Sequence, residues 1–343
     1  MHAAVYHGRG DIRIEDVREP PAPGPGELVL AVARASICGT DAAEWSHGPH
    51  LARPGVTLGH EFTGTVLATG TDAGGLREGD RVVSGAGVSC GECAWCRAGR
   101  TNLCASYYTL GLQADGGLAE LVRTPASICH RVPDACSDEA AAMAQPLAVA
   151  LHAVARSGVA AGDTCAVIGA GGIGALVIFA AAARGARVIA IDVDEQRLAS
   201  ARVLGAHLAL DARGADLAEL VLEATAGEGA SVVIEASGAP HAPAAAARAV
   251  RRGGRVLLIG LQAAPRELDL LALTLREVSL ETTVAHVCAV DVPAALELLA
   301  TRALAEHVLG GVIALEELVE AGIRPLANGV ARGKTVVALS SAP

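Results

Sequence analysis

The chain has 343 residues, a length that one hydrophobic core rarely supports and that favours two domains. Apolar residues make up 52% of the sequence and charged residues 19%, as in a folded globular protein rather than a disordered one. The formal net charge of −10, without a basic stripe, argues against binding to nucleic acid or to an anionic membrane surface.

The first part of the chain, up to about residue 130, predicts a β-rich domain. Short β-type runs at 27–35, 62–70 and 80–85 alternate with glycine and proline turns. Charged residues interrupt the N-terminal segment early, so it lacks the pattern of a secretory signal, and we expect a cytoplasmic protein. An alanine-rich helical stretch follows at 139–155, and we expect Pro146 to break it.

Beyond residue 162 the sequence alternates between strands and helices. Strands are predicted at 164–170, 187–192, 207–212, 231–237 and 255–261, with a helix after each of the first four. Such alternation predicts a parallel sheet with helices on both faces, the doubly wound α/β arrangement. The uncharged segment 164–183 is long enough to cross a membrane, but its glycines favour a buried strand, turn and helix.

The last part of the chain predicts one helix at 292–302 and a closing strand at 335–339. We expect these elements to return to the first domain. The fold class is therefore α/β, with a β-rich domain at 1–147 and 287–343 and a Rossmann-type domain at 148–286.

Four of the nine cysteines lie in one short loop, at Cys90, Cys93, Cys96 and Cys104. In a reducing compartment this clustering indicates a metal rather than disulfides. Four thiolates close a tetrahedral zinc shell without a place for water, so the site would be structural. An iron–sulfur cluster is the alternative. In the bacterial pattern, however, the fourth cysteine follows at a shorter spacing and is itself followed by a proline, which is not the case for Cys104. The cysteines that match no motif, and that we expect to be buried, are Cys129, Cys136, Cys165 and Cys288.

A glycine-rich segment follows the predicted strand at 164–170 and opens a helix. The spacing of Gly169, Gly171 and Gly174 is typical of a turn that binds the pyrophosphate of a dinucleotide at a helix N-terminus. The next strand ends at Asp192, whose carboxylate can bind the adenosine ribose and would repel the extra phosphate of NADP. We therefore expect NAD as the cofactor.

Two further segments, 38–41 and 59–61, carry possible ligands for a second zinc. A buried free cysteine and an ordinary core histidine are the alternatives for each segment by itself. Taken together, Cys38, His60 and Glu61 could hold a zinc with an open position, as a catalytic site requires. The ion would polarise an alcohol oxygen, so that a hydride could leave to nicotinamide.

These motifs together resemble the zinc-containing medium-chain dehydrogenases, in particular the polyol branch with sorbitol, butanediol, threonine and glucose dehydrogenases. The segments CGTD, GHE, the four-cysteine loop, QPL and GAGGIG occur in the family's order along essentially the whole chain. The resemblance implies a GroES-like catalytic domain, a Rossmann domain and an active site in the cleft between them. It also implies a homodimer or homotetramer, and the segment 278–284 is a predicted edge strand for that pairing.

The activity implied is that of a zinc-dependent oxidoreductase that transfers a hydride between a secondary alcohol and NAD, giving the ketone. Two zinc ions per chain are expected, one structural and one catalytic. The residues that the resemblance assigns to the catalytic zinc and the reaction are Cys38, Thr40, His60, Glu61 and Gln145. Those assigned to the cofactor are Gly169, Gly171, Gly172, Ile173, Gly174, Asp192 and Lys334. For Lys334 an ordinary surface lysine is the alternative to a contact with the cofactor phosphates.

Two positions depart from the family pattern. Gln145 stands where the polyol branch commonly has glutamate, although some glucose dehydrogenases are similar in having glutamine. Ala43 stands where many relatives have a histidine that passes the proton to solvent. These departures leave an inactive NAD-binding protein as one alternative. A zinc-free quinone or enoyl reductase on the same scaffold is the other, although the intact zinc motifs argue against it. The small number of aromatic residues favours diols, polyols, sugars or cyclitols over aromatic alcohols.

Overall fold

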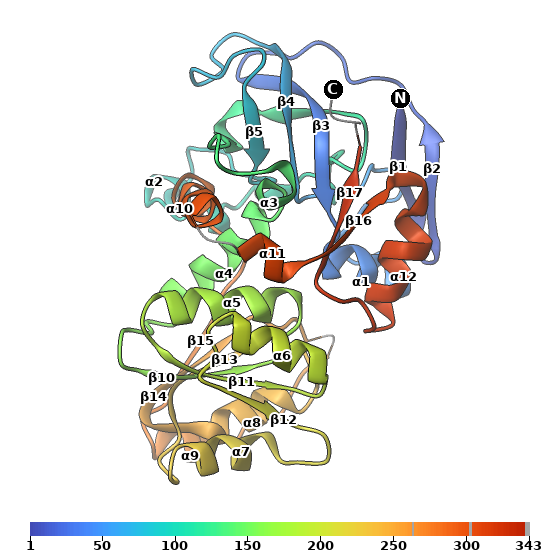
Figure 1. Cartoon of the computed structure of the whole chain (residues 1–343). Coiled ribbons are helices and arrows are strands. Elements are labelled where there is room, and N and C mark those ends of the chain that lie inside the picture. Colours follow the sequence, from blue (N-terminus) through green and yellow to red (C-terminus); the bar gives the residue numbers. More distant parts are fainter. Residues whose placement is uncertain (263, 302–303, 340–343) are drawn as a thin grey trace. The chain divides into compact units, whose positions relative to one another are not determined.

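The structure is a computed structural model that describes residues 1–262, 264–301 and 304–339. The chain divides into two compact units, shown in Figure 1. Unit 1 comprises Met1–Ala148 and His286–Pro343, and unit 2 comprises Val149–Ala285. None of the described helices is long and apolar enough to cross a membrane.

Unit 1 is built on a seven-stranded sheet in the order β16-β17-β3-β4-β5-β9, with β8 also paired to β3. Its strands are β3 (Glu27–Ser36), β4 (Phe62–Thr69), β5 (Arg81–Ser84), β8 (Leu121–Pro125), β9 (Cys129–Arg131), β16 (Leu309–Ala314) and β17 (Lys334–Ala338). Late strand β17 runs antiparallel to early strand β3, with Val336 opposite Ser36. Segments far apart in the sequence therefore lie side by side at the centre of this sheet.

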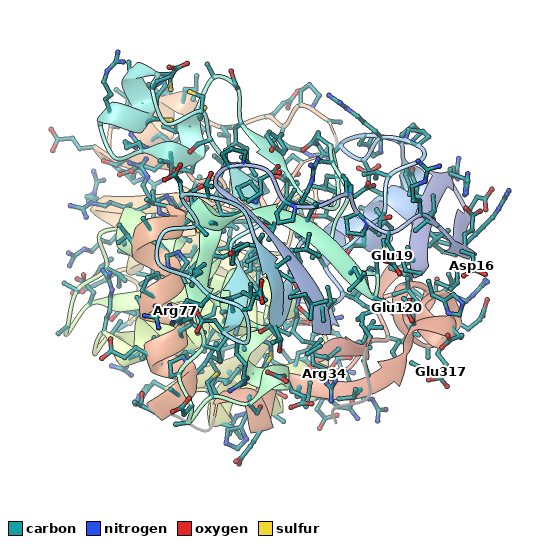
Figure 2. All side chains as sticks on the ribbon, turned by 90° about the horizontal axis from the view of Figure 1, so that it is seen from above. Asp16, Glu19, Arg34, Arg77, Glu120 and Glu317 are labelled. Carbon is teal, nitrogen blue, oxygen red and sulfur yellow. The ribbon has the colours of Figure 1, made fainter. Side chains whose placement is uncertain are left out.

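Short elements surround this sheet. They are β1 (His2–Gly8), β2 (Asp11–Asp16), β6 (Gly87–Val88), β7 (Tyr108–Thr109), α1 (Gly39–His47), α2 (Ala94–Arg97), α3 (Asp138–Ala141), α10 (Cys288–Thr301), α11 (Leu304–Val308) and α12 (Arg324–Ala327). The tighter or wider turns are η1 (Thr101–Leu103), η2 (Ala126–Ile128), η3 (Leu315–Glu317) and the π-helix η4 (Leu318–Ile323). Fully buried side chains such as Tyr6, Leu30 and Phe62 form the core, whereas charged residues such as Asp16 and Arg77 are exposed, and Figure 2 shows Asp16 at the margin of the view.

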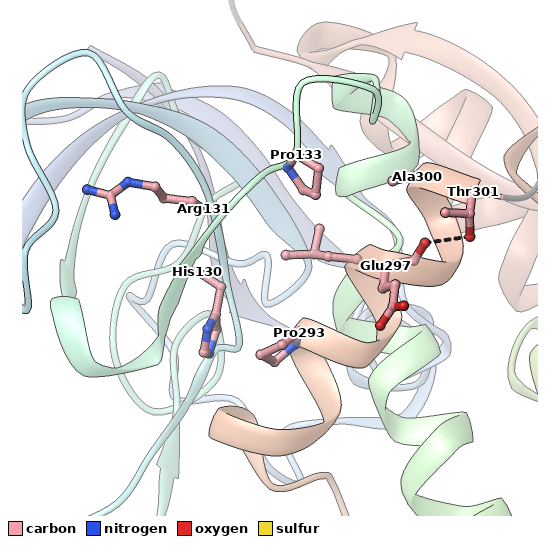
Figure 3. A pocket seen from close by; sticks show the side chains of 8 residues that line it. His130, Arg131, Pro133, Pro293, Glu297, Ala300 and Thr301 are labelled. Carbon is pink, nitrogen blue, oxygen red and sulfur yellow. Dashed lines mark hydrogen bonds between the residues drawn. The ribbon is translucent and has the colours of Figure 1, made fainter.

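A cavity of about 440 Å³ lies in unit 1 between β9 and α10. Its lining residues, drawn in Figure 3, are His130, Arg131, Pro133, Pro293, Leu296, Glu297, Ala300 and Thr301. The guanidinium of Arg131 already pairs with Asp80 at 2.8 Å, and Thr301 donates its hydroxyl to the Glu297 carbonyl. None of the residues predicted to bind metal or cofactor lines this cavity.

Unit 2 is a six-stranded parallel sheet in the order β12-β11-β10-β13-β14-β15. Its strands are β10 (Thr164–Ile168), β11 (Arg187–Asp192), β12 (Leu208–Asp211), β13 (Ala230–Glu235), β14 (Val250–Leu258) and β15 (Ser279–Thr282). Its helices are α5 (Gly172–Ala183), α6 (Glu195–Val203), α7 (Leu217–Ala224), α8 (Ala242–Ala249) and α9 (Leu270–Thr274). Helices α5 and α6 cover one face, and α7 and α8 cover the other (Figure 1).

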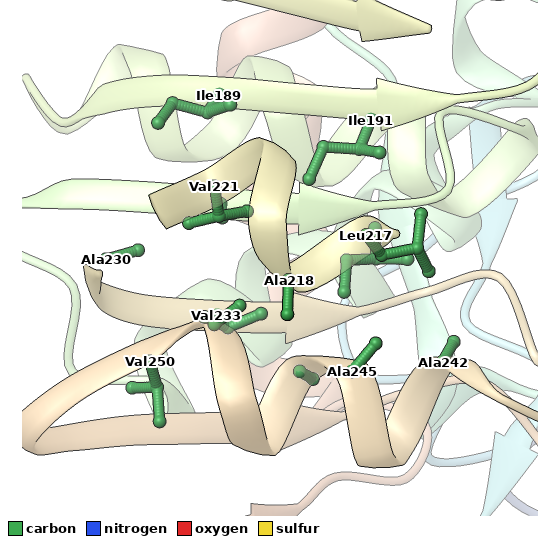
Figure 4. Close-up of a cluster of buried hydrophobic side chains, with 14 of the residues drawn as sticks. Ile189, Ile191, Leu217, Ala218, Val221, Ala230, Val233, Ala242, Ala245 and Val250 are labelled. Atoms are coloured by element: carbon green, nitrogen blue, oxygen red, sulfur yellow. The ribbon is translucent and has the colours of Figure 1, made fainter. Parts of the chain in front are cut away.

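One hydrophobic core of unit 2 lies between the sheet and helices α7 and α8. Figure 4 shows Ile189, Val233 and Val250 of the strands packed with Val221 and Ala245 of these helices. Each large aliphatic side chain buried here contributes about 1.5–3 kcal/mol of transfer free energy. This packing fixes the edge of the sheet where β10, β11 and β13 end.

The alternation predicted beyond residue 162 is confirmed, including the strand, turn and helix over 164–183. The helical stretch at 139–155 is indeed interrupted, but the break falls between α3 and α4 (Ala144–Arg156), before Pro146. Pro146 lies in the first turn of α4, where a missing N–H costs no helical hydrogen bond. The prediction that this proline itself breaks the helix is therefore wrong.

Candidate active site

Cys38 lies where strand β3 passes into helix α1. The residue is in an extended conformation just before the helix, and its backbone N–H donates to Asp41 Oδ2 at 2.9 Å. The Thr40 hydroxyl lies in the first turn of α1, with Oγ1 3.7 Å from Cys38 Sγ. The start of this helix therefore holds the thiol and the hydroxyl next to each other.

His60 and Glu61 lie immediately before strand β4 and are both buried. Gly59 precedes them with φ +96°, and a Cβ at this position would lie 2.5 Å from the Leu118 backbone nitrogen. Only glycine fits this close approach, which directs the next two side chains inward. The ligand atoms of Cys38, His60 and Glu61 all lie within 4.8 Å of one another.

A buried carboxylate, Asp41, faces the histidine of this cluster. Its Oδ1 atom is 3.6 Å from His60 Nδ1, which leaves Nε2 of His60 as the nitrogen for a metal. Burial opposes the charged ring, but Cys38 and Asp41 outweigh it and raise the pKa of His60 to about 10. Burial also raises the pKa of Asp41, and His60 opposes that change. A carboxylate behind a ligating histidine is a common way to orient the ring.

Glu61 is held from behind by two donors. Lys334 Nζ and Ser36 Oγ both bind Glu61 Oε2, and the lysine also donates to the Ile37 carbonyl at 3.0 Å. Burial lowers the pKa of Lys334, but the neighbouring Glu61 outweighs it and the pKa is raised. Glu61 Oε1 is therefore the oxygen left for a metal.

The donor set fits a zinc ion. It offers sulfur, nitrogen and oxygen ligands of the types that zinc prefers. His60 binds a metal as the neutral ring and Cys38 as the thiolate. In these forms the cluster and Asp41 would carry three negative charges against the single positive charge of Lys334, a balance that a divalent ion would neutralise. Gln145 is buried in the first turn of α4, and among the described residues no hydrogen bond connects it with the cluster.

The four-cysteine loop brings its sulfur atoms together. The Sγ–Sγ distances are 3.5 Å for Cys93–Cys96, 3.5 Å for Cys90–Cys104 and 3.9 Å for Cys90–Cys96. A tetrahedron with zinc–sulfur distances of about 2.3 Å has sulfur–sulfur edges of about 3.8 Å. Disulfides would require about 2 Å. Sulfur atoms this close fit a single ion better than a multi-iron cluster. The four unassigned cysteines are buried, as predicted.

The glycine-rich turn lies between β10 and α5, at the edge of the sheet where the parallel strands end. Gly169 has φ +94°, and a Cβ on Gly174 would lie 1.9 Å from the Gly169 carbonyl oxygen. Asp192, at the end of β11, accepts from the Ala170 N–H at 2.7 Å. Arg197, which sequence reasoning did not single out, places Nη1 3.9 Å from Asp192 Oδ1.

Comparisons with known proteins match both units. The family model of the alcohol dehydrogenase GroES-like domain matches residues 24–134, and that of the zinc-binding dehydrogenases matches residues 172–301. The chain is 37% identical to a sorbitol dehydrogenase of Halalkalibacterium halodurans over 76% of each chain. It is 34% identical to human sorbitol dehydrogenase over 81% of this chain and 79% of the relative. The chain belongs to the zinc-containing medium-chain alcohol dehydrogenases.

A solved structure supports the same conclusion for this dehydrogenase. The fold superposes on the crystal structure of 2R,3R-butanediol dehydrogenase from Bacillus subtilis with a TM-score of 0.89, at 30% identity. The superposition covers 98% of this chain and 99% of the other. The predicted GroES-like and Rossmann-type domains are thus confirmed. The protein is a zinc-dependent oxidoreductase acting on alcohol CH–OH groups, and the zinc-free reductase and the inactive protein are not favoured.

Some residues of the dehydrogenase's site were not predicted in their present roles. Asp41 belongs to the CGTD segment, but nothing in the sequence indicated that it would face His60. No sequence motif indicated that Ser36 would bind Glu61. Lys334 is 6% exposed, so it is not a surface lysine. Its contact is with Glu61, while the predicted contact with the cofactor phosphates stays a prediction.

Proposed function

We propose that the protein oxidises a secondary alcohol of the diol, polyol, sugar or cyclitol type to its ketone, with NAD as the hydride acceptor. The observation that carries this proposal is the convergence of Cys38, His60 and Glu61 within 4.8 Å beside the Thr40 hydroxyl. Each turnover converts the alcohol and NAD⁺ into the ketone, NADH and one proton.

Each residue of the cluster has a distinct task in this proposal. Cys38, His60 and Glu61 would hold a catalytic zinc, with Gln145 at its border. When bound, zinc supplies positive charge that lowers the pKa of the alcohol hydroxyl. Thr40 accepts a hydrogen bond from the substrate hydroxyl and takes the first step in removing its proton. Ala43 is exposed, so we propose that water replaces the missing histidine in carrying this proton away.

The four-cysteine loop would hold a second, structural zinc, because its four thiolates leave no open position. The cofactor proposal assigns the pyrophosphate to the turn formed by Gly169, Gly171, Gly172, Ile173 and Gly174. Asp192 would bind the adenosine ribose and favour NAD over NADP. Asp192 Oδ2 accepts the Ala170 N–H at 2.7 Å, and a carboxylate oxygen can accept a second hydrogen bond, here from a ribose hydroxyl.

We also propose that two or more copies of the chain associate through unit 2. Strand β15 pairs with β14 on one side and is the last strand of the parallel sheet, so the backbone groups on its other side have no strand partner among the described residues. The neighbouring side chains Leu270, Leu271 and Leu280 are 66%, 69% and 39% exposed. An unpaired edge with exposed leucines is suited to pairing with a second copy.

The proposed function is tested by supplying zinc-replete enzyme and NAD with a panel of diols, polyols, sugars and cyclitols and recording NADH absorbance. We expect turnover of at least one class, lost on chelation and restored by zinc. Cys38→Ser should abolish turnover and keep the protein folded. Cys136→Ser, at a buried cysteine outside both clusters, is the matched control and should retain activity. Failure of added zinc to restore the chelated enzyme would contradict the catalytic role.

A further inference from the structure

Glu235 is a fully buried carboxylate at the end of strand β13. Strand β10 lies between β11 and β13, and Glu235 is in register with Ile168, the last residue of β10. Asp192 occupies the corresponding end of β11. Two carboxylates therefore flank the strand that leads into the glycine-rich turn.

One oxygen of Glu235 holds the turn that follows β13. Glu235 Oε1 accepts from the Ser237 N–H at 2.7 Å, the Ser237 hydroxyl at 2.6 Å and the Gly238 N–H at 2.9 Å. The Ser237 hydroxyl oxygen in turn accepts from the Ala239 N–H at 3.1 Å. Three donors converge on this one oxygen, so the turn that they belong to, residues 236–238, is held in a single conformation.

The turn 236–238 is in direct contact with the first glycine of the glycine-rich turn. A Cβ on Gly169 would lie 2.8 Å from both Cα and Cβ of Ser237. The Ala236 N–H also donates to the Ile168 carbonyl at 2.9 Å. On the other side, Asp192 accepts from the Ala170 N–H. The start of the glycine-rich turn is thus held between two backbone segments that carboxylates fix.

The second oxygen of Glu235 has no donor among the residues that the structure describes. Oε2 is buried, and a Cβ on Gly260 would lie 2.4 Å from it. A buried acceptor without a donor costs free energy. Glu235 therefore fixes the turn 236–238 through Oε1, while burial of the unpartnered Oε2 lowers the free energy of unfolding.

We propose that Glu235 is a positioning residue for the dinucleotide. It does not touch the cofactor. By fixing the turn 236–238 it fixes Gly169, and with it the backbone N–H groups at the start of α5 that would receive the pyrophosphate. A site held in its bound geometry before the ligand arrives binds more tightly, because less freedom is lost on binding. The inference rests on the proposed dinucleotide site.

The test measures the affinity of Glu235→Gln for NADH and for NADPH by fluorescence titration, together with kcat at saturating NAD and the melting temperature. We expect both dissociation constants to rise about tenfold. The effect should be equal for the two dinucleotides, because Glu235 acts on the pyrophosphate turn and not on the ribose. Saturating NAD should restore kcat to within about twofold of the wild type.

Two other variants disturb the same contacts from other positions. Ser237→Ala removes one donor to Oε1, and Gly260→Ala places a methyl group against Oε2. Both should weaken dinucleotide binding in the same sense, so the test survives if Glu235→Gln fails to fold. The matched control is Asp163→Asn. Asp163 lies just before the N-terminal end of β10, at the other end of this strand from the glycine-rich turn, and its carboxylate accepts from the Ala160 N–H at 2.9 Å. It should leave both dissociation constants unchanged.

Three results would overturn the inference: a lower melting temperature with unchanged dinucleotide affinity, a lower kcat at saturating NAD with unchanged affinity, or a loss restricted to one dinucleotide. Wild-type protein that binds neither NADH nor NADPH would instead refute the proposed function.

Discussion

Lys334 is the only lysine in the sequence, and its ammonium group is buried against Glu61. Because this amine is buried and its pKa is raised, it is protonated and shielded from reagents. An amine-reactive acylating reagent should therefore modify Lys334 at least about 100-fold more slowly in native than in denatured protein. Peptide mass spectrometry measures both rates, and the amine of Met1 serves as the internal reference. Rapid labelling of Lys334 in the native protein would contradict the buried pair.

Asp192 decides the cofactor preference in our proposal. Replacing it with alanine should relax the preference for NAD over NADP by about 1–3 kcal/mol, because the repulsion of a phosphate disappears. Arg197, which lies 3.9 Å from the carboxylate, then favours the extra phosphate. Ratios of kcat/KM for the two cofactors measure the change, with Asp194→Asn as the neighbouring control. Wild-type enzyme that prefers NADP would contradict the role of Asp192.

The four-cysteine loop is an element whose geometry depends on its ion. Thiolates repel one another when no ion lies between them, so metal binding and folding of the loop should be coupled. Cys93→Ser should reduce the zinc content from two ions to one per chain and lower the melting temperature. Elemental analysis and thermal unfolding measure these effects, with Cys129→Ser as a non-ligand control. Retention of both ions by Cys93→Ser would refute this assignment.

Helix α3 is attached to strand β3 by an ion pair, with Arg34 Nε 2.8 Å from Glu139 Oε1. Burial would raise the pKa of Glu139, but its backbone hydrogen bond and Arg34 outweigh burial and lower it. The folded pKa is then below the unfolded value of about 4.3, so the stabilisation is present above that pH. It is lost as the pH falls through the folded pKa.

Glu139→Gln should therefore reduce the free energy of unfolding by about 0.5–1 kcal/mol at pH 7. The difference from wild type should shrink towards zero at a pH well below the unfolded value of about 4.3, where Glu139 is protonated in the folded state as well. Urea unfolding at both pH values measures it, and Glu316→Gln, at an exposed position, is the control. A difference that persists at the lower pH would show that Arg34 does not act through charge.

Sequence periodicity was most informative for the elements of unit 2, where buried apolar runs alternate with helices. It missed β16, because the glycines at 310 and 311 interrupt a short strand, and α9, which spans little more than one turn. The proposed zinc ligands Cys38, His60 and Glu61 were singled out by their local motifs, and the structure brings their ligand atoms within 4.8 Å of one another. The contact between Lys334 and Glu61 could not be found in this way, because 273 residues separate the two and only the pairing of β17 with β3 brings them together.

At the scale of the whole molecule, association through β15 predicts a dimer or tetramer at micromolar concentration. Leu280→Lys should weaken it, because a charge at the pairing edge opposes strand addition. Light scattering measures the mass of each variant. Val312→Lys, at a residue of unit 1 that is 45% exposed, is the matched control and should leave the mass unchanged. A monomeric wild type would contradict the proposed association.

The pairing of β17 with β3 also has a consequence for the order of events on the ribosome. The four cysteines of the structural loop leave the exit tunnel within a few residues of one another, so that loop can capture zinc while most of the chain is still unmade. Cys38, His60 and Glu61 emerge earlier still, but the lysine that neutralises Glu61 is translated 273 residues later. Until then a buried carboxylate would lack its counter-charge, which opposes its burial. The buried cluster around Glu61 can therefore be completed only after Lys334 has been synthesised, by which time all of unit 2 has already been made.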